Sequence, residues 1–130
     1  MRRKMPKPLQ RKALLSFCRS LPHVTEDVKW GNDLVFSIGD KMFAGFGVDG
    51  GAGFGCKCSE DDFAALTELE GIVPAPYAAR FFWISVRDPR ALSETDAKDL
   101  LRKSYDLVLG KLPAKFRAKV AGAAVKSKSR

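Results

Sequence analysis

The stretch Leu34–Cys58 constrains the fold more than any other part of the chain, because glycine turns divide it into three short extended runs. Leu34 to Ile38 is rich in β-branched and aromatic residues, and Gly39-Asp40 suits the positive φ angles of a tight hairpin turn. Lys41 to Val48 continues the extended pattern, and Asp49-Gly50-Gly51 turns the chain again. The alternation of apolar residues predicts an antiparallel sheet with one apolar face.

A sheet with one apolar face needs helices to cover it, and the flanking sequence supplies three candidates. Apolar residues repeat at spacings of three and four over 8–21, 59–69 and 93–112, and prolines, glycines and serines bound these segments. Two β-prone runs, 24–30 and 80–86, are expected to add strands. With 130 residues and 45% hydrophobic content, the sequence predicts one α+β domain.

The same periods assign particular side chains to the core. Met42, Ala44 and Phe46 are expected to share one face of their strand, since side chains two residues apart point the same way. Leu69 is expected to complete the apolar stripe of the second helix. The proline-rich segment 74–76 is expected to be an extended connector without regular structure.

The positive charge of the chain lies at its two ends. Residues 1–20 and 111–130 each hold seven Lys or Arg and no acidic residue, which leaves nine basic and fifteen acidic residues for 21–110. Such segregation indicates a polyanionic partner, for example nucleic acid, while basic ends can also serve solubility alone. An anionic membrane surface is a weaker alternative, because the basic tail has no strong apolar face.

Basic residues that lie off the apolar stripes are the candidate contacts to a polyanion. In the first helix Arg11, Lys12 and Arg19 are expected to face solvent. The full candidate set for nucleic-acid binding is Arg2, Arg3, Lys4, Lys7, Arg11, Lys12, Arg19, Lys41, Arg80, Lys111, Lys115, Arg117 and Lys119. Whether the first helix and the C-terminal segment lie side by side decides whether these residues form one patch.

No cofactor, metal or catalytic site is expected from the motifs. Gly45, Gly47 and Gly50 match G-x-G-x-x-G, but no helix follows them to hold a pyrophosphate, so they indicate hairpin positions. Cys56 and Cys58, with Cys18 and His23 as conceivable partners, lack the C-x₂-C and H-x₃₋₅-H spacings of zinc sites, so buried thiols are expected. His23 is the only histidine, and no nucleophile motif accompanies it, so a non-enzymatic protein is expected.

A cytoplasmic location is expected from the start of the chain and from its cysteines. No apolar run approaches the roughly 20 residues that span a bilayer, and the basic start lacks the apolar block of a secretory signal. An odd number of cysteines, three, favours a reducing compartment over a disulfide framework.

Aromatic residues suggest an alternative kind of surface. Only one face of the strand expected at 80–86 can pack inward, so part of the run around Trp83 must point outward. Outward aromatic side chains beside Arg80 and Arg87 can stack on bases or bind a protein or a small ligand. A protein-interaction or small-ligand module is therefore the alternative to a nucleic-acid-binding one.

Several local runs together resemble the MmcQ/YjbR family, over roughly residues 10–115. The most specific are Gly39-Asp40-Lys41-Met42-Phe43-Ala44, Trp83 in its strand, and Ser104 to Val108 followed by Lys111-Leu112-Pro113. The resemblance implies a frataxin-like α+β fold, in which N- and C-terminal helices cover one face of an antiparallel sheet. It also implies a DNA-binding protein with a double-wing motif, the wings being β-hairpins.

The sequence departs from wing-mediated binding, because its hairpin turns carry Asp40, Asp49 and only Lys41 as a base. A role in iron handling, as in frataxins, is also disfavoured. Frataxins resemble one another in having an acidic first helix, whereas the first helix expected in this chain is basic. We therefore expect a basic arm at 1–7, one domain at 8–115 and a frayed basic tail at 116–130, with nucleic acid as partner and DNA favoured over RNA.

Overall fold

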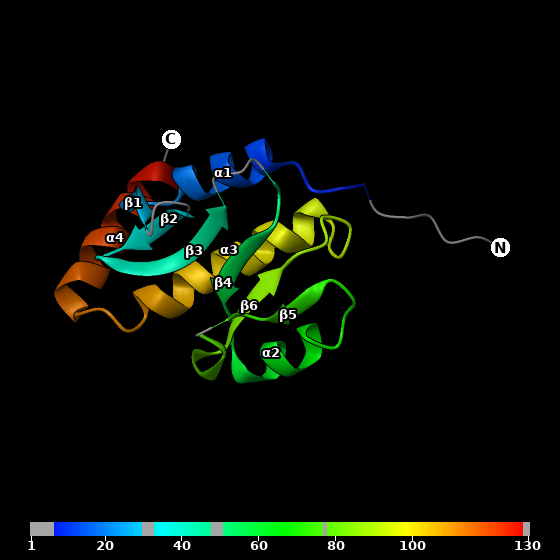
Figure 1. Ribbon diagram of the computed structural model, residues 1–130. Coiled ribbons are helices and arrows are strands. Elements are labelled where there is room, and N and C mark those ends of the chain that lie inside the picture. Colours follow the sequence, from blue (N-terminus) through cyan, green and yellow to red (C-terminus); the bar gives the residue numbers. More distant parts are fainter. Residues whose placement is uncertain (1–6, 30–32, 48–50, 77, 129–130) are drawn as a thin grey trace.

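The computed structural model describes residues 7–29, 33–47, 51–76 and 78–128, with side chains in the last helix only as far as residue 122. Its elements, in chain order, are α1 (Arg11–Ser20), β1 (Val24–Lys29), β2 (Asp33–Ile38), β3 (Lys41–Gly47), β4 (Phe54–Lys57), α2 (Glu60–Leu66), β5 (Ile72–Pro74), the 3₁₀ helix η1 (Ala79–Phe81), β6 (Trp83–Val86), α3 (Glu94–Leu109) and α4 (Ala114–Lys128) (Figure 1). No helix among these described residues is long and apolar enough to cross a membrane.

The strands form one antiparallel sheet in the order β1-β2-β3-β4-β6-β5, which confirms the expected α+β class. The turn between β2 and β3 is the tight one expected, since Gly39 and Asp40 have φ angles of 58° and 64°. A side chain at Gly39 would also collide with Leu112, because an added Cβ would lie 2.7 Å from its Cδ1. The second predicted turn, at Asp49-Gly50-Gly51, and the end of the extended run at Val48 fall mostly on residues 48–50, which lie outside the described residues.

Helices α3 and α1 pack on the same face of the sheet (Figure 1). Helix α3 crosses β2, β3 and β4, while α1 packs against α3 and β1. The largest fully buried side chains come from both layers and are Tyr105, Phe36, Phe43, Phe46, Leu14, Ile38, Ile72, Ile84 and Leu101. The apolar face predicted from the alternation is thus covered by the predicted helices.

A β-bulge changes which side chains of β3 enter the core. Phe36 pairs with Ala44, but Ser37 pairs with Met42, so Phe43 is an extra residue between them. Phe43 and Ala44 are both fully buried, whereas Met42 is half-buried. The expectation that Met42 shares the face of Ala44 is therefore wrong, because strict alternation does not hold across a bulge.

Two adjacent residues of α3 fasten it to the rest of the domain by hydrogen bonds. The Ser104 hydroxyl donates to the Phe43 carbonyl at 2.6 Å and accepts from the Lys57 amide at 2.9 Å, which joins α3 to both β3 and β4. The Tyr105 hydroxyl donates to the Pro22 carbonyl at 2.6 Å, just beyond α1. Buried polar groups of this kind stabilise the fold only while they are paired.

Three local predictions need correction. Residues 80 and 81 belong to η1 and Phe82 has a left-handed φ of 63°, so the last long strand expected begins only at Trp83. Helix α2 ends at Leu66, before the predicted end at residue 69. Leu69 is 45% exposed, so it does not complete the apolar stripe of this helix as expected. The proline-rich connector is partly strand, since β5 runs to Pro74 at the sheet edge, where its missing amide costs no ladder bond.

The C-terminal segment was expected to form at most a weak helix, with Phe116 and Val120 docking on the domain, and to fray into a basic tail. Helix α4 spans Ala114–Lys128, so the boundary expected at residue 115 falls inside its first turn. Val120 is only 3% exposed and Phe116 packs against the core, as the apolar positions of this segment predict. The first two turns of α4 therefore belong to the packed domain.

Replacing Ser104 by Ala should lower the free energy of unfolding by about 2–4 kcal/mol, because it leaves the buried Phe43 carbonyl and the Lys57 amide without their partner. Chemical denaturation measures the change. Ser20→Ala is the control, since the exposed Ser20 hydroxyl bonds only within α1 and its loss should cost less than about 0.5 kcal/mol. Equal stabilities for the two variants would contradict a bridging role for Ser104.

Candidate nucleic-acid interface

Arg11 does not face solvent as expected. Its guanidinium donates from Nη1 to the Gly47 carbonyl and, at 2.8 Å, to the Gly51 carbonyl, and its Cζ lies 5.9 Å from the centroid of the Phe46 ring. These contacts tie the first residue of α1 to both ends of the turn between β3 and β4. Arg11 is consequently engaged in the fold, and its side chain is only half exposed.

Arg19 is also engaged. Its Nε and Nη2 donate to both carboxylate oxygens of Glu26 in β1, at 2.8 and 2.9 Å, and this hydrogen bonding holds the pKa of Glu26 below its ordinary value. Lys7 and Lys12 remain exposed, and Arg2, Arg3 and Lys4 lie outside the described residues. The outer side of α1 is therefore a poorer source of free positive charge than the sequence indicated.

A second group of bases gathers where several turns meet at one end of the sheet. We call it the turn cluster, and its members are Lys41, Lys57, Arg80, Phe81 and Lys111. The turn holding Lys111 reaches the β2–β3 turn through Leu112, which packs against Gly39, two residues before Lys41. Lys57 at the end of β4 joins η1, because its ammonium donates to the Phe81 carbonyl at 2.7 Å.

Lys57 and Lys111 lie close enough to influence each other. Partial burial lowers the pKa of the Lys57 ammonium below its ordinary value, and the charge of Lys111 lowers it further. An anion would relieve the repulsion between these two ammonium groups. Acidic residues are close along the chain: Asp40 directly precedes Lys41, and Glu60, Asp61 and Asp62 follow Lys57 within five residues.

Phe81 is an exposed aromatic residue on a fixed backbone. Its side chain is 50% exposed, and the Arg80 guanidinium lies 4.8 Å from its ring centroid, within the range of a cation–π contact. The next residue, Phe82, is half-buried, and its ring lies edge-on to the ring of Phe63, with the centroids 5.7 Å apart. The left-handed backbone at Phe82 thus separates an exposed ring from a half-buried one.

Helix α4 carries a third group of bases, and we call Lys115, Arg117 and Lys119 together with Lys111 the α4 basic surface. All four are exposed, and the Arg117 Nε donates to the Leu112 carbonyl at 2.9 Å, which keeps it over the turn before the helix. Ring contact between Phe116 and His23, with centroids 6.3 Å apart, places the start of α4 beside the turn after α1. Residues 107–130 contain no acid.

The bases of α3 differ from those of α4 in having acidic partners. Lys98, Lys103 and Arg102 pair with Glu94, Asp99 and Asp106 along one helix, at 2.7, 3.4 and 3.3 Å. Among the described residues, no ion pair includes a base of the α4 basic surface. The charges of α4 are therefore available to a partner.

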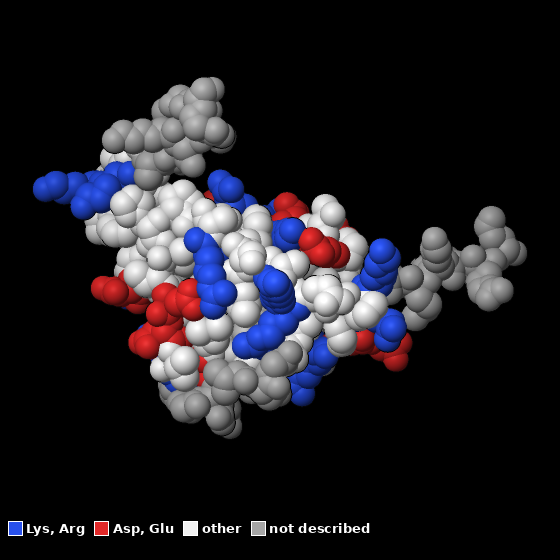
Figure 2. Space-filling view, turned by 90° about the horizontal axis from the view of Figure 1, so that it is seen from above, with Lys and Arg blue, Asp and Glu red and all other residues white. Residues whose placement is uncertain are grey.

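The structure joins some predicted site residues and separates others. Lys41 and Lys111 belong to turns that meet where Leu112 packs against Gly39, and Arg80 lies in η1, which Lys57 contacts. Lys111 is followed along the chain by Lys115, Arg117 and Lys119. Arg11 and Arg19 are held by contacts at α1, while Lys12 stays exposed and Phe116 brings the start of α4 beside the turn after α1. A single basic patch from α1 to the C-terminus stays a prediction. Seen from above, basic side chains lie in separate groups, with acidic side chains beside them (Figure 2).

Sequence reasoning missed Lys57 as a site residue because it lies between two core cysteines. Its position in the strand was the available signal: Cys56 and Cys58 point inward, so Lys57 must point to the opposite face, where it pairs with Trp83.

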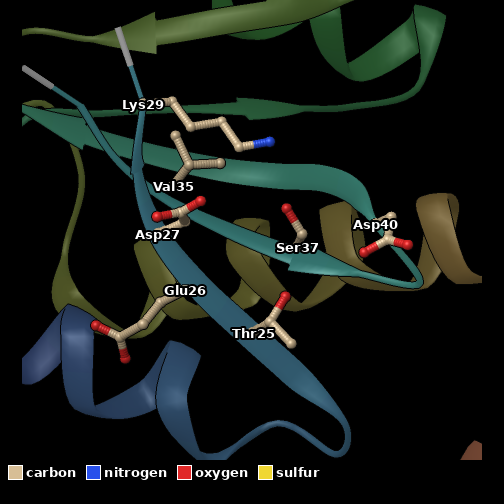
Figure 3. Close-up of a pocket in the computed structure, with 7 residues that line it drawn as sticks. All are labelled: Thr25, Glu26, Asp27, Lys29, Val35, Ser37 and Asp40. Carbon is tan, nitrogen blue, oxygen red and sulfur yellow. The ribbon is translucent and has the colours of Figure 1, made fainter. Parts of the chain in front are cut away.

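The face of the sheet away from the helices holds a small hollow (Figure 3). Its volume is about 110 Å³, and Asp27, Lys29, Ser37 and Asp40 supply most of its polar groups. Ligand pockets for drug-sized molecules have about 300–1,000 Å³, so this hollow suits a few waters better than a metabolite. On the same face Trp83 is half-buried beside Gly55, whose added Cβ would lie 3.9 Å from its ring.

The three cysteines are free thiols in the core. Burial raises the pKa of Cys18 to about 12 and that of Cys58 to about 11, and it raises the pKa of Cys56 as well. Among the described residues, no group of three or more His, Cys, Asp or Glu side chains is placed to hold a metal ion. Protonated, inaccessible thiols are chemically inert at neutral pH.

At pH 8 the folded protein should therefore resist alkylation by iodoacetamide at Cys18, Cys56 and Cys58, because the thiolate is the reacting form. Mass spectrometry checks this, with the protein in guanidinium as the control in which all three thiols react. The free energy of unfolding should also fall as pH rises from 9.0 towards about 11, since the unfolded thiol of Cys58 ionises first. Rapid labelling of the native protein would contradict the burial described here.

Comparison with known proteins identifies a matching family model and solved structures with a similar fold. A family model described as YjbR matches residues 19–107. A crystal structure of a Deinococcus radiodurans protein with the domain DUF419 has a TM-score of 0.78 and 24% identity, covering 90% of this chain and 92% of that one. A crystal structure of a Pseudomonas syringae protein has a TM-score of 0.61 and 20% identity, covering 77% of this chain and 99% of that one. No curated protein matches the sequence.

Proposed function

The chain belongs to the YjbR family, and we propose that it binds nucleic acid through phosphate contacts from the α4 basic surface, with DNA favoured over RNA. The observation that carries the proposal is that Lys115, Arg117 and Lys119 on the anchored helix α4, and Lys111 in the turn before it, form no ion pair with any described acid. Bases that neutralise phosphates and release counterions supply most of the affinity of non-specific binding.

Anchoring of α4 matters because it fixes where the charges lie. Phe116 and Val120 hold one side of the helix against the core. Lys115 and Lys119 are four residues apart, so their Cβ atoms are neighbours about 6 Å apart along one flank. A frayed tail would have to be ordered on binding, at a cost of roughly 1–2 kcal/mol per residue, whereas these turns are already helical.

The helix is a better candidate than the hairpin wings for holding phosphate. The described hairpin tip between β2 and β3 combines Asp40 with Lys41, so its charges nearly cancel.

The order of a first helix, an antiparallel sheet and closing helices over one face supports a frataxin-like arrangement, which remains part of this proposal. The basic α1 supports no role in iron handling.

A protein-interaction role for the outer sheet face is the second candidate. It is favoured by Trp83, a half-buried aromatic side chain beside the small residue Gly55 on the face away from the helices. Trp is enriched at interface hot spots, and small neighbours let a partner approach the ring. The small volume of the hollow on this face disfavours a small organic ligand.

Replacing Lys111, Lys115 and Lys119 together by Gln should weaken DNA binding and reduce its salt dependence. Each lost phosphate contact makes the slope of log affinity against log salt shallower by about 0.9 for duplex DNA, so the triple variant should lose about 2.7. Fluorescence anisotropy of a labelled duplex at several salt concentrations measures both quantities.

The matched control replaces Lys98, Arg102 and Lys103 of α3 by Gln, which removes the same net charge from residues already paired with acids. The control should keep a slope close to that of the unaltered protein. Equal slopes for all three proteins would show that α4 does not contact phosphate. A wild-type protein with no measurable affinity at low salt would overturn the proposed function itself.

A further inference from the structure

We propose that the turn cluster is a base-stacking site for single-stranded nucleic acid, with the Phe81 ring as the platform. This inference rests on the proposed function and names the form of nucleic acid that the protein prefers. Proteins that bind single strands combine aromatic side chains, on which bases stack, with cationic groups that follow the backbone. The turn cluster combines both within a few residues.

The first step of the argument is that Phe81 is outward and pre-positioned. Its amide donates to the Ala78 carbonyl at 3.1 Å, and its carbonyl accepts from the Lys57 ammonium at 2.7 Å. The Phe82 carbonyl accepts from the Cys58 amide at 2.9 Å, which fixes the chain just after it. The backbone is thus held on both sides while the ring stays 50% exposed.

The second step concerns what the fold gains from this ring. The half-buried aromatic position of the turn is filled by Phe82, which packs on Phe63. Phe81 is absent from the buried core, and its described ring contact is the one with the Arg80 guanidinium. An exposed phenylalanine beside an exposed guanidinium offers two flat surfaces, and both stack on nucleobases.

The third step is that the cations around the ring suit the backbone of the same strand. Lys57 contacts η1 through the Phe81 carbonyl, and its pKa is lowered first by partial burial and also by the charge of Lys111. Phosphates flanking a stacked base would relieve this repulsion. From Lys111 the same strand can continue along the α4 basic surface.

A duplex suits the turn cluster less well than a single strand. In a duplex each base face is covered by its neighbours, and exposing one requires unstacking that costs a few kcal/mol. Phe81 can therefore stack on a base of a single strand at lower cost. Its ring contributes affinity only where base faces are open.

The experiment compares an oligo(dT) single strand, an abasic oligomer with the same number of phosphates, and a duplex, at one salt concentration. The wild-type protein should bind oligo(dT) more tightly than the abasic oligomer. Phe81→Leu should weaken binding to oligo(dT) by about five- to a hundredfold, as the loss of one stacking contact does, and should leave the abasic oligomer and the duplex unaffected.

Phe81→Tyr is the matched control, because it keeps a ring that can stack and should retain the preference for oligo(dT). Thermal melting of both variants checks that this exposed position leaves the fold intact. Equal affinity of wild type and Phe81→Leu for oligo(dT) would overturn the stacking site while leaving phosphate binding by α4 standing. No binding of wild type to any of the three nucleic acids would overturn the proposed function and, with it, this inference.

Discussion

The hydroxyl of Ser104 is the polar contact on which the arrangement of sheet and helices depends. It bonds the carbonyl of the bulged residue Phe43 and the amide of Lys57, so one atom of α3 fixes the helix over two neighbouring strands. Apolar burial alone is non-directional and would permit α3 to slide along the sheet. Because the Ser104 hydroxyl is both donor and acceptor and is fully buried, α3 cannot slide along the sheet without breaking both of its hydrogen bonds.

The same contact links the core to the proposed binding surface. The Lys57 amide donates to the Ser104 hydroxyl, and the Lys57 ammonium donates to the Phe81 carbonyl in η1. Lys57 therefore connects α3 to the turn that carries the exposed ring.

Most of the fold could be predicted because it follows from local periods. Strand alternation and helical stripes identify the apolar faces, and the positive φ angles at Gly39 and Asp40 follow from residue type. The bulge at Phe43 could not be predicted from the sequence. Phe43 and Ala44 are adjacent and both apolar, so either of them could point to the core until the pairing with the neighbouring strand is known. The left-handed Phe82 was equally hidden, because β-prone residues such as Phe81 and Phe82 normally indicate a strand.

The candidate site was less predictable because the positive charge that a base can offer to a partner depends on whether an acidic side chain already lies beside it. Sequence counts give Arg19 and Lys119 the same weight, yet Arg19 lies against the carboxylate of Glu26, whereas Asp106, the acid nearest to Lys119 along the chain, is 13 residues away. A base already paired gives up that contact when it binds phosphate, so its net contribution is small. The useful charge is therefore what remains after internal pairing, and among the described residues it includes the bases of α4 and Lys57 as well as Lys7 and Lys12 near α1. Under the proposed function, a single strand bound along α4 and Lys111 would also meet the exposed ring of Phe81, so that phosphate binding and base stacking would act on the same strand.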